Sequence, residues 1–237
     1  MPIGQKDQQL LLKVQLLSGI PERVLPELTK EAFVQGLPKG TILFDRGDSA
    51  QFLHVALTGR VAITSAIAER ETIIVIRDAG EAILDPALIL GVPYATGARL
   101  IEGGRIMMIP AQRFREIMTA DAATAAVTLQ ALAETSLTLT RHIRDLKLLT
   151  TIQRLARHLL SMIDTTSGTA TLTLRDDRPV LAALLGMTPE SLSRAFAHLR
   201  TIGVNTDKSG SISVENVRKL RSLSKLEERI ENEARPK

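Results

Sequence analysis

The chain has 237 residues, of which 44% are hydrophobic and 24% charged, and its formal net charge at pH 7 is +4. This length accommodates one large domain or two modest ones with separate cores. The absence of cysteine excludes disulfides, thiol catalysis and cysteine-ligated zinc or iron–sulfur clusters. No apolar run reaches the roughly 18 residues of a membrane span, and the N-terminus does not read as a secretory signal. We therefore expect a cytoplasmic protein without a membrane partner.

The first half of the sequence changes from helical to extended patterning. Leucines at helical spacing predict a helix over 7–18, and a short second helix follows over 22–31. Between 33 and 109, short runs rich in Val, Ile, Leu and Thr alternate with Gly, Pro and Asp; the clearest runs are 41–44, 52–57, 60–64, 72–76 and 105–109. Short strands with regular turn signals predict an antiparallel β-sandwich or barrel.

A long helix is predicted after a short one at 111–118. Asp121 is a suitable N-cap, and the helical pattern runs to 149. Within it, residues at spacings of three and four form a heptad seam of Leu129, Leu132, Ser136, Leu139, Ile143 and Leu146. We interpret the seam as a dimer contact, because Val127 and Leu137 offer a second apolar face to the helix's own domain. Packing of the seam within one chain is the alternative.

The C-terminal part has the pattern of a winged helix-turn-helix. Thr150 and Thr151 precede a helix at 152–163, and a strand is predicted at 169–174. In the segment 177–204, Asp177 is predicted to cap one helix and Thr188 the next, with Gly186 in the turn between them. The sequence after 201 resembles a β-hairpin wing. A helical hairpin with solvated polar residues is the alternative reading.

The second helix of this motif carries side chains suited to reading DNA. Glu190, Ser193 and Arg194 are predicted to lie opposite its apolar face and to enter the major groove. Arginine pairs with guanine, glutamate accepts from the cytosine amine, and serine serves a base or a phosphate. Thr188 and Lys208, which lies at the predicted wing tip, complete the expected contacts, and Lys208 would reach a phosphate. Duplex DNA is thus the predicted partner.

From about residue 10 to 220 the chain resembles the Crp/Fnr family of bacterial regulators, most specifically at 37–61 and 181–194. The resemblance implies an α+β fold, with an N-terminal cyclic-nucleotide-binding-type antiparallel β-roll, a long dimerisation helix and a C-terminal winged helix-turn-helix. The E-x-x-S-R pattern at 190–194 is similar to the Fnr type of reader, which implies a half-site like TTGAT in an inverted repeat. The domains are then 1–149, with the dimerisation helix at 121–149, and 150–237.

The sensor departs from the family pattern. Cyclic-AMP binders of this family carry a Gly-Glu pair and an Arg-Ser pair that hold the ribose and the phosphate. Here Leu84 and Asp85 stand at the first pair, and Ala95 and Thr96 at the second. Because a buried phosphate without arginine is poorly compensated, we expect that cyclic AMP is not the effector, although these four residues mark the candidate pocket.

The cofactor stays unknown from the sequence. An iron–sulfur cluster is excluded by the lack of cysteine, and no metal site is predicted. A branch of the family that resembles denitrification regulators is thought to sense nitric oxide through haem, which makes His54 and His142 candidate haem ligands. A structural role is the more ordinary reading for a lone histidine on a strand.

These observations favour a transcription regulator over other classes. No nucleophile–base pair, zinc-protease, Walker or dinucleotide motif is present, so an enzyme is not expected. Two alternatives stay open: a cyclic-nucleotide-type module that acts on a protein partner, and a cyclic-AMP-responsive regulator. The family resemblance adds a homodimer and activation through RNA polymerase as expectations. The sequence identifies neither the effector nor the regulated genes.

Overall fold

The computed structural model describes residues 9–68, 70–207 and 210–224. The chain forms two compact units, Met1–Leu139 and Thr140–Lys237, which divide within the long helix α6 (Ala122–Leu148). The sequence-based boundary at 149/150 instead gives the whole helix to the first domain, and that assignment stays a prediction. The part of α6 up to Leu139 belongs to the first unit and the part from Thr140 belongs to the second. The two units are therefore described in turn.

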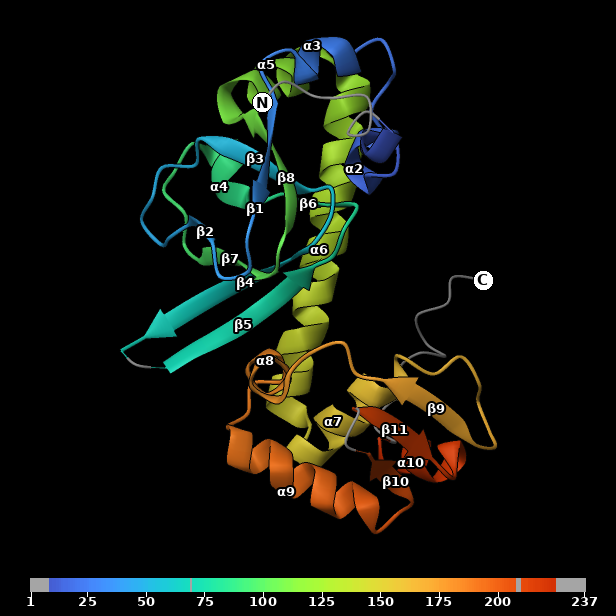
Figure 1. Ribbon diagram of the computed structural model, residues 1–237. Helices are drawn as coiled ribbons and strands as arrows, with labels where there is room; N and C mark the ends of the chain where they lie inside the picture. Colours follow the sequence, from blue (N-terminus) through green and yellow to red (C-terminus); the bar gives the residue numbers. More distant parts are fainter. Residues whose placement is uncertain (1–8, 69, 208–209, 225–237) are drawn as a thin grey trace. The chain divides into compact units, whose positions relative to one another are not determined.

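The first unit contains two antiparallel four-stranded sheets that form the β-roll (Figure 1). One sheet has the order β1-β8-β3-β6 and the other β2-β7-β4-β5. The strands are β1 (Phe33–Leu37), β2 (Ile42–Phe44), β3 (Phe52–Ala56), β4 (Arg60–Ile67), β5 (Arg70–Arg77), β6 (Glu81–Ile83), β7 (Gly97–Glu102) and β8 (Gly104–Pro110). The expected antiparallel β-roll is confirmed, and the five predicted runs lie in β2, β3, β4, β5 and β8.

Short helices surround the β-roll: α2 (Gln15–Ser18), α3 (Leu25–Thr29), α4 (Pro86–Leu90) and α5 (Ala111–Ala120). The single helix predicted at 7–18 is wrong in the described part, because the chain is extended at Val14 before α2 starts. Val14 is fully buried, and the amide of Gln15 donates to the carbonyl of Gly80 at 3.1 Å. Core packing and this contact with the β5–β6 turn override the local helical pattern.

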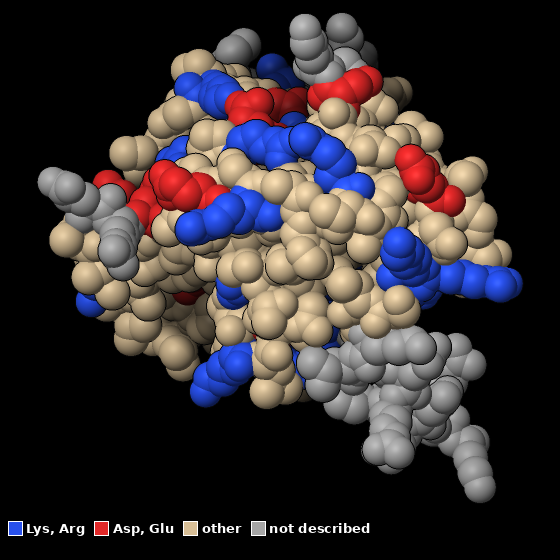
Figure 2. Space-filling model, turned by 90° about the horizontal axis from the view of Figure 1, so that it is seen from below, with Lys and Arg blue, Asp and Glu red and all other residues tan. Residues whose placement is uncertain are grey.

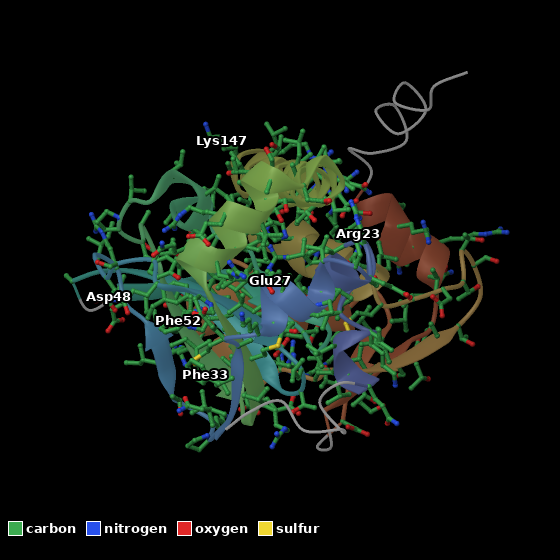
Figure 3. All side chains as sticks on the ribbon, turned by 90° about the horizontal axis from the view of Figure 1, so that it is seen from above. Arg23, Glu27, Phe33, Asp48, Phe52 and Lys147 are labelled. Atoms are coloured by element: carbon green, nitrogen blue, oxygen red, sulfur yellow. The ribbon has the colours of Figure 1, made fainter. Side chains whose placement is uncertain are left out.

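Strand β3 separates two apolar cores in the first unit. Leu53 and Val55 belong to the core under the helices, whereas Ala56 belongs to the core inside the β-roll. Successive side chains of a strand point to opposite faces, so His54 shares the inner face with Ala56. Phe52 lies on the same side and packs edge-to-face on Phe33, with ring centroids 5.6 Å apart (Figure 3).

The second unit joins helices to a small antiparallel sheet with the order β10-β11-β9. Its elements are α7 (Thr151–Leu160), β9 (Ala170–Thr173), α8 (Arg178–Leu184), α9 (Pro189–Arg200), β10 (Val204–Thr206), β11 (Ser211–Val214) and α10 (Val217–Leu223). Thr150 caps α7 in a capping box with Gln153, as its position suggested. Asp177 occupies the N-cap position of α8, but its side chain makes no capping hydrogen bond, which corrects that expectation.

Candidate functional sites: a DNA-reading helix and a sensor

A tight turn joins α8 to α9 and sets the direction of the second helix. Gly186 adopts the left-handed conformation with φ +60°, which costs an L-residue energy but not glycine. A Cβ at this position would also lie 2.7 Å from the Cδ2 atom of Leu146. Thr188 then starts α9, because its hydroxyl oxygen accepts from the amide of Ser191 at 3.2 Å. The predicted helix-turn-helix is present.

Helix α9 has one buried and one exposed face. Leu192, Ala195, Phe196 and Leu199 are buried in the core of the second unit. Over this face, the guanidinium of Arg178 stacks on the ring of Phe196 at 3.7 Å, a cation–π contact between α8 and α9. The remaining side of α9 exposes its polar side chains, namely Thr188, Glu190, Ser193 and Arg194. The structure thus places these four predicted residues together on one solvent-facing surface, and their roles at DNA stay predictions.

Local hydrogen bonds set the ionisation of Glu190 and the bonding capacity of Ser193 on this surface. Hydrogen bonding to the helix N-terminal backbone lowers the pKa of Glu190, and Thr188 and the charge of Arg194 act in the same direction. Glu190 is therefore ionised and can accept from a base amine. The hydroxyl of Ser193 donates to the carbonyl of Pro189 at 2.9 Å, so its oxygen is left to accept a further hydrogen bond.

The wing is the hairpin of β10 and β11, whose turn begins at Asp207. The amide of Ser211 donates to the Asp207 carboxylate at 2.9 Å and closes the turn. Lys208, the predicted phosphate contact, lies outside the described residues. Seen from below, the molecule shows separate lysine and arginine side chains among neutral surface, with acidic side chains beside several of them (Figure 2).

The predicted dimer seam lies largely in solvent. Leu129, Ile143 and Leu146 are 69%, 54% and 52% exposed, and Ser136 is exposed as well. Leu132 and Leu139 are half-buried, and Leu132 packs against the core of the first unit. The apolar stripe therefore has little cover from its own chain, as a partner-binding surface requires.

The four residues of the predicted effector pocket do not build a phosphate site. Leu84 is buried in the core under the helices. Asp85 caps α4, with a carboxylate oxygen that accepts from the amide of Ala87 at 2.8 Å. Ala95 is exposed, and the hydroxyl of Thr96 is buried without a hydrogen-bond partner. None of these four residues supplies a positive charge that could compensate a cyclic phosphate, and no arginine or lysine in the described chain is fully buried.

Tyr94 fills the interior of the β-roll, and sequence reasoning missed it. Its ring stacks on Phe44 with centroids 3.7 Å apart, and its hydroxyl donates to the carbonyl of Phe52 at 3.1 Å. Burial raises the pKa of this phenol, and the nearby carboxylates of Asp85 and Asp48 raise it further. Because Tyr94 follows a proline in a turn, nothing local in the sequence signals that it points inward.

His54 is enclosed by this same aromatic cluster. It is 4% exposed, its ring lies 5.5 Å from that of Phe44, and its Nδ1 atom has no hydrogen-bond partner. Burial lowers the pKa of His54 from 6.5 to about 4, against a smaller upward effect of a backbone hydrogen bond with Phe52. The orphaned nitrogen could ligate a metal, but the packed rings leave no room for a macrocycle, so these surroundings do not fit haem at His54.

The other proposed haem ligand, His142, is half-buried on α6 in the second unit. Among the residues that the structure describes, no group of three or more His, Asp or Glu side chains could hold a metal ion. Within the same residues, no helix combines the length and the apolar character that a membrane crossing requires.

Comparisons with known proteins agree with this architecture. The family model of the cyclic nucleotide-binding domain matches residues 34–121, and that of the Crp-like helix-turn-helix domain matches 153–223. No protein of curated function matches the chain.

Solved structures share the arrangement over most of the chain. A putative cyclic nucleotide binding protein from Ruegeria pomeroyi is 28% identical, with a TM-score of 0.58, over 92% of this chain and 96% of that one. FixK2 from Bradyrhizobium japonicum is 20% identical, with a TM-score of 0.69, over 81% and 96%. The c-di-GMP responsive global regulator CLP of Xanthomonas campestris is 20% identical, with a TM-score of 0.68, over 82% and 99%. The last two likenesses concern the fold alone.

Proposed function

Because this chain belongs to the Crp/Fnr family of DNA-binding transcription regulators, and so is not an enzyme, we propose that it binds an inverted repeat of Fnr-like half-sites as a homodimer. The observation that carries the proposal is the exposed face of α9, where Glu190, Ser193 and Arg194 lie together while the opposite face is packed into the core. A helix anchored in this way presents fixed side chains to a major groove.

The chemistry of these side chains suits the half-site TTGAT. Arg194 would make two hydrogen bonds to O6 and N7 of the guanine, and ionised Glu190 would accept from the amine of a cytosine. Ser193 has a free acceptor for a base amine or a neighbouring water. Thr188 and Lys208 would contact phosphates, which position the protein without selecting sequence.

The dimer would form along α6. Its uncovered stripe follows the spacing of a coiled coil, in which a second copy buries the a and d positions. Ile143→Lys should therefore shift the protein toward monomer in analytical ultracentrifugation. Leu137→Lys is the matched control, because Leu137 is 51% exposed, close to the 54% of Ile143, but lies off the seam. Equal behaviour of the two variants would contradict the seam.

Regulation would come from an effector that binds the β-roll unit. Such a ligand shifts the equilibrium between dimer states only if it binds them unequally. The productive state would place two recognition helices about 34 Å apart on DNA, one helical turn. We further propose that the protein acts in the cytoplasm and activates transcription through RNA polymerase, an extension by family analogy.

Cyclic AMP is not the proposed effector, since Tyr94 occupies the β-roll and no buried cation is present in the described chain. Low-micromolar binding of cyclic AMP in calorimetry would overturn this part and favour a cyclic-AMP-responsive regulator. A haem role at His142 would be indicated by a Soret shift when haem is added and lost in His142→Ala.

A gel-shift titration with TTGAT-N4-ATCAA duplex tests the DNA proposal directly. Arg194→Ala should lose about 1–3 kcal/mol of binding free energy and relax the preference for guanine at the third position. Arg200→Ala is the matched control, because Arg200 is exposed on the last turn of the same helix and removes the same charge. An unchanged base preference in Arg194→Ala would refute its role. Failure of the wild-type protein to bind any duplex would favour a module that acts on a protein partner.

A further inference from the structure

A groove of about 300 Å³ lies in the first unit, outside the β-roll interior. It opens where α2, the β5–β6 region and the N-terminal part of α6 meet, and Figure 1 shows α2 beside α6. Leu16 and Leu84 in its wall belong to the core under the helices, whereas Tyr94 belongs to the other core. The lining residues are Gln15, Leu16, Gly19, Arg77, Glu81, Ala82, Leu84, Val127, Gln130, Ala131, Glu134, Thr135 and Thr138.

The apolar part of this groove depends on a close approach of two helices. A Cβ on Gly19 would lie 2.9 Å from Cγ1 of Val127, so glycine at this position allows the end of α2 to approach α6. Val127 and Ala131 then continue the apolar wall that Leu16 and Leu84 begin. A volume of this size is at the lower limit for small-molecule sites, which restricts the occupant to a small ligand.

The one arginine that lines the groove is already neutralised. A guanidinium nitrogen of Arg77 lies 3.7 Å from a carboxylate oxygen of Glu81, and another donates to the hydroxyl of Thr135 at 3.2 Å. The second carboxylate oxygen of Glu81 accepts from the amide of Asp78 at 2.7 Å. Arg77 and Glu81 therefore compensate each other and add no net charge to the groove.

Glu134 is the charge that remains. Its carboxylate accepts from the side-chain amide of Gln130 at 2.9 Å, and no salt bridge joins it to a cation among the described residues. Thr138 lies one turn further along the same face of α6. Its hydroxyl and the amide oxygens of Gln15 and Gln130 add further acceptors to the carboxylate.

We propose that this groove binds a small organic cation, a primary amine on a short apolar chain. An ammonium group donates up to three hydrogen bonds and accepts none, which matches the carboxylate and the neutral acceptors around Glu134. The chain of the ligand would lie on Val127, Ala131 and Leu84. This inference deepens the proposed function, since it assigns the chemical class of the effector.

The groove and the predicted dimer seam use different faces of α6. Glu134 lies two residues from both Leu132 and Ser136 of the seam, which turns it to the far side of the helix. A dimer formed along the seam would therefore leave Glu134 accessible. A ligand held there would contact α2, the β-roll and the dimerisation helix together.

Calorimetric titration of the full-length protein tests the proposal with three probes of one chain length: butylamine, butanol and butyrate. Butylamine should bind, whereas the neutral alcohol and the anion should not. Glu134→Gln keeps the size and the neighbouring amide contact but removes the charge, and should weaken butylamine binding at least about ten-fold. Glu116→Gln is the control, because the side-chain amide of Gln112 donates to Glu116 with the same spacing on α5, at 3.0 Å.

Butylamine binding that is absent, matched by butyrate or butanol, or unchanged in Glu134→Gln would overturn the assignment. Gel shifts with and without butylamine separate this result from the proposed function. DNA binding in either gel shift together with a failed titration refutes only the groove, while amine binding with no DNA binding in either gel shift refutes only the DNA-reading role.

Discussion

The buried histidine of the β-roll predicts a specific dependence of stability on pH. Burial lowers the pKa of His54 to about 4 in the folded state, from 6.5 for the free side chain. Well above pH 6.5 the His54 ring is neutral in both the folded and the unfolded state, so its burial does not change the dependence of the unfolding free energy on pH. As pH falls below 6.5, only the unfolded chain takes up the proton, so the free energy of unfolding decreases until pH reaches about 4.

The size of this effect follows from linkage. The difference between a pKa of 6.5 and one of about 4 corresponds to at most about 3.4 kcal/mol of unfolding free energy. Between pH 8 and pH 5 the same two pKa values give a loss of about 2 kcal/mol, because the unfolded histidine is then almost fully protonated and the folded one is not. This is a large fraction of the stability of an ordinary domain.

The protein carries its own probe for the measurement. It has one tyrosine and no tryptophan, and that tyrosine, Tyr94, lies in the same core as His54. Urea unfolding followed by tyrosine fluorescence at pH 8 and pH 5 therefore reports on the first unit. His54→Phe should fit among the neighbouring rings and should remove about 2 kcal/mol of the pH-dependent loss, while carboxylates that titrate in this range still contribute. If His54→Phe and the wild-type protein lose equal stability between the two pH values, the burial argument is wrong.

Substitutions at Gly186, Tyr94 and Thr188, with their controls, test the packing that positions the sites. Gly186→Ala and Gly168→Ala both place alanine at positive φ, which should cost about 1–2 kcal/mol in urea unfolding. A Cβ at Gly186 also meets Leu146, whereas a Cβ at Gly168 meets open space. Gly186→Ala should therefore cost more than Gly168→Ala, and a Leu146→Ala background should remove that difference. In thermal unfolding followed by circular dichroism, Tyr94→Ala should cost about 3–5 kcal/mol of stability and Tyr94→Phe about 1 kcal/mol. Equal losses in the two variants would contradict ring stacking as the main contribution of Tyr94. Thr188→Ala should lower the stability of the second unit by about 1 kcal/mol, whereas Thr188→Ser should retain the cap; a wild-type-like Thr188→Ala would contradict the capping role.

The placement of the side chains on α9 could be predicted in detail because its determinants are local. The two helices, their turn and the exposed side chains occupy one continuous segment, 177–204, and helical periodicity assigns each residue to a face. Thr188 caps its helix as predicted, and Leu192, Phe196 and Leu199 are buried. The cap expected from Asp177 did not form, which shows that a capping residue type does not ensure a capping hydrogen bond.

The interior of the β-roll could not be predicted in the same way, because its determinants are distant in sequence. The sequence by itself determined that the β-roll lacks the residue types of a cyclic-AMP site. Only the tertiary structure decided what fills the β-roll instead. Tyr94 stacks on Phe44 with ring centroids 3.7 Å apart, although strands β3 to β6 separate the two residues in the sequence. The groove at Glu134 likewise requires α2, β6 and α6 to meet. Periodicity assigns a residue to a face of its own element, but pairing of distant elements determines what that face contacts.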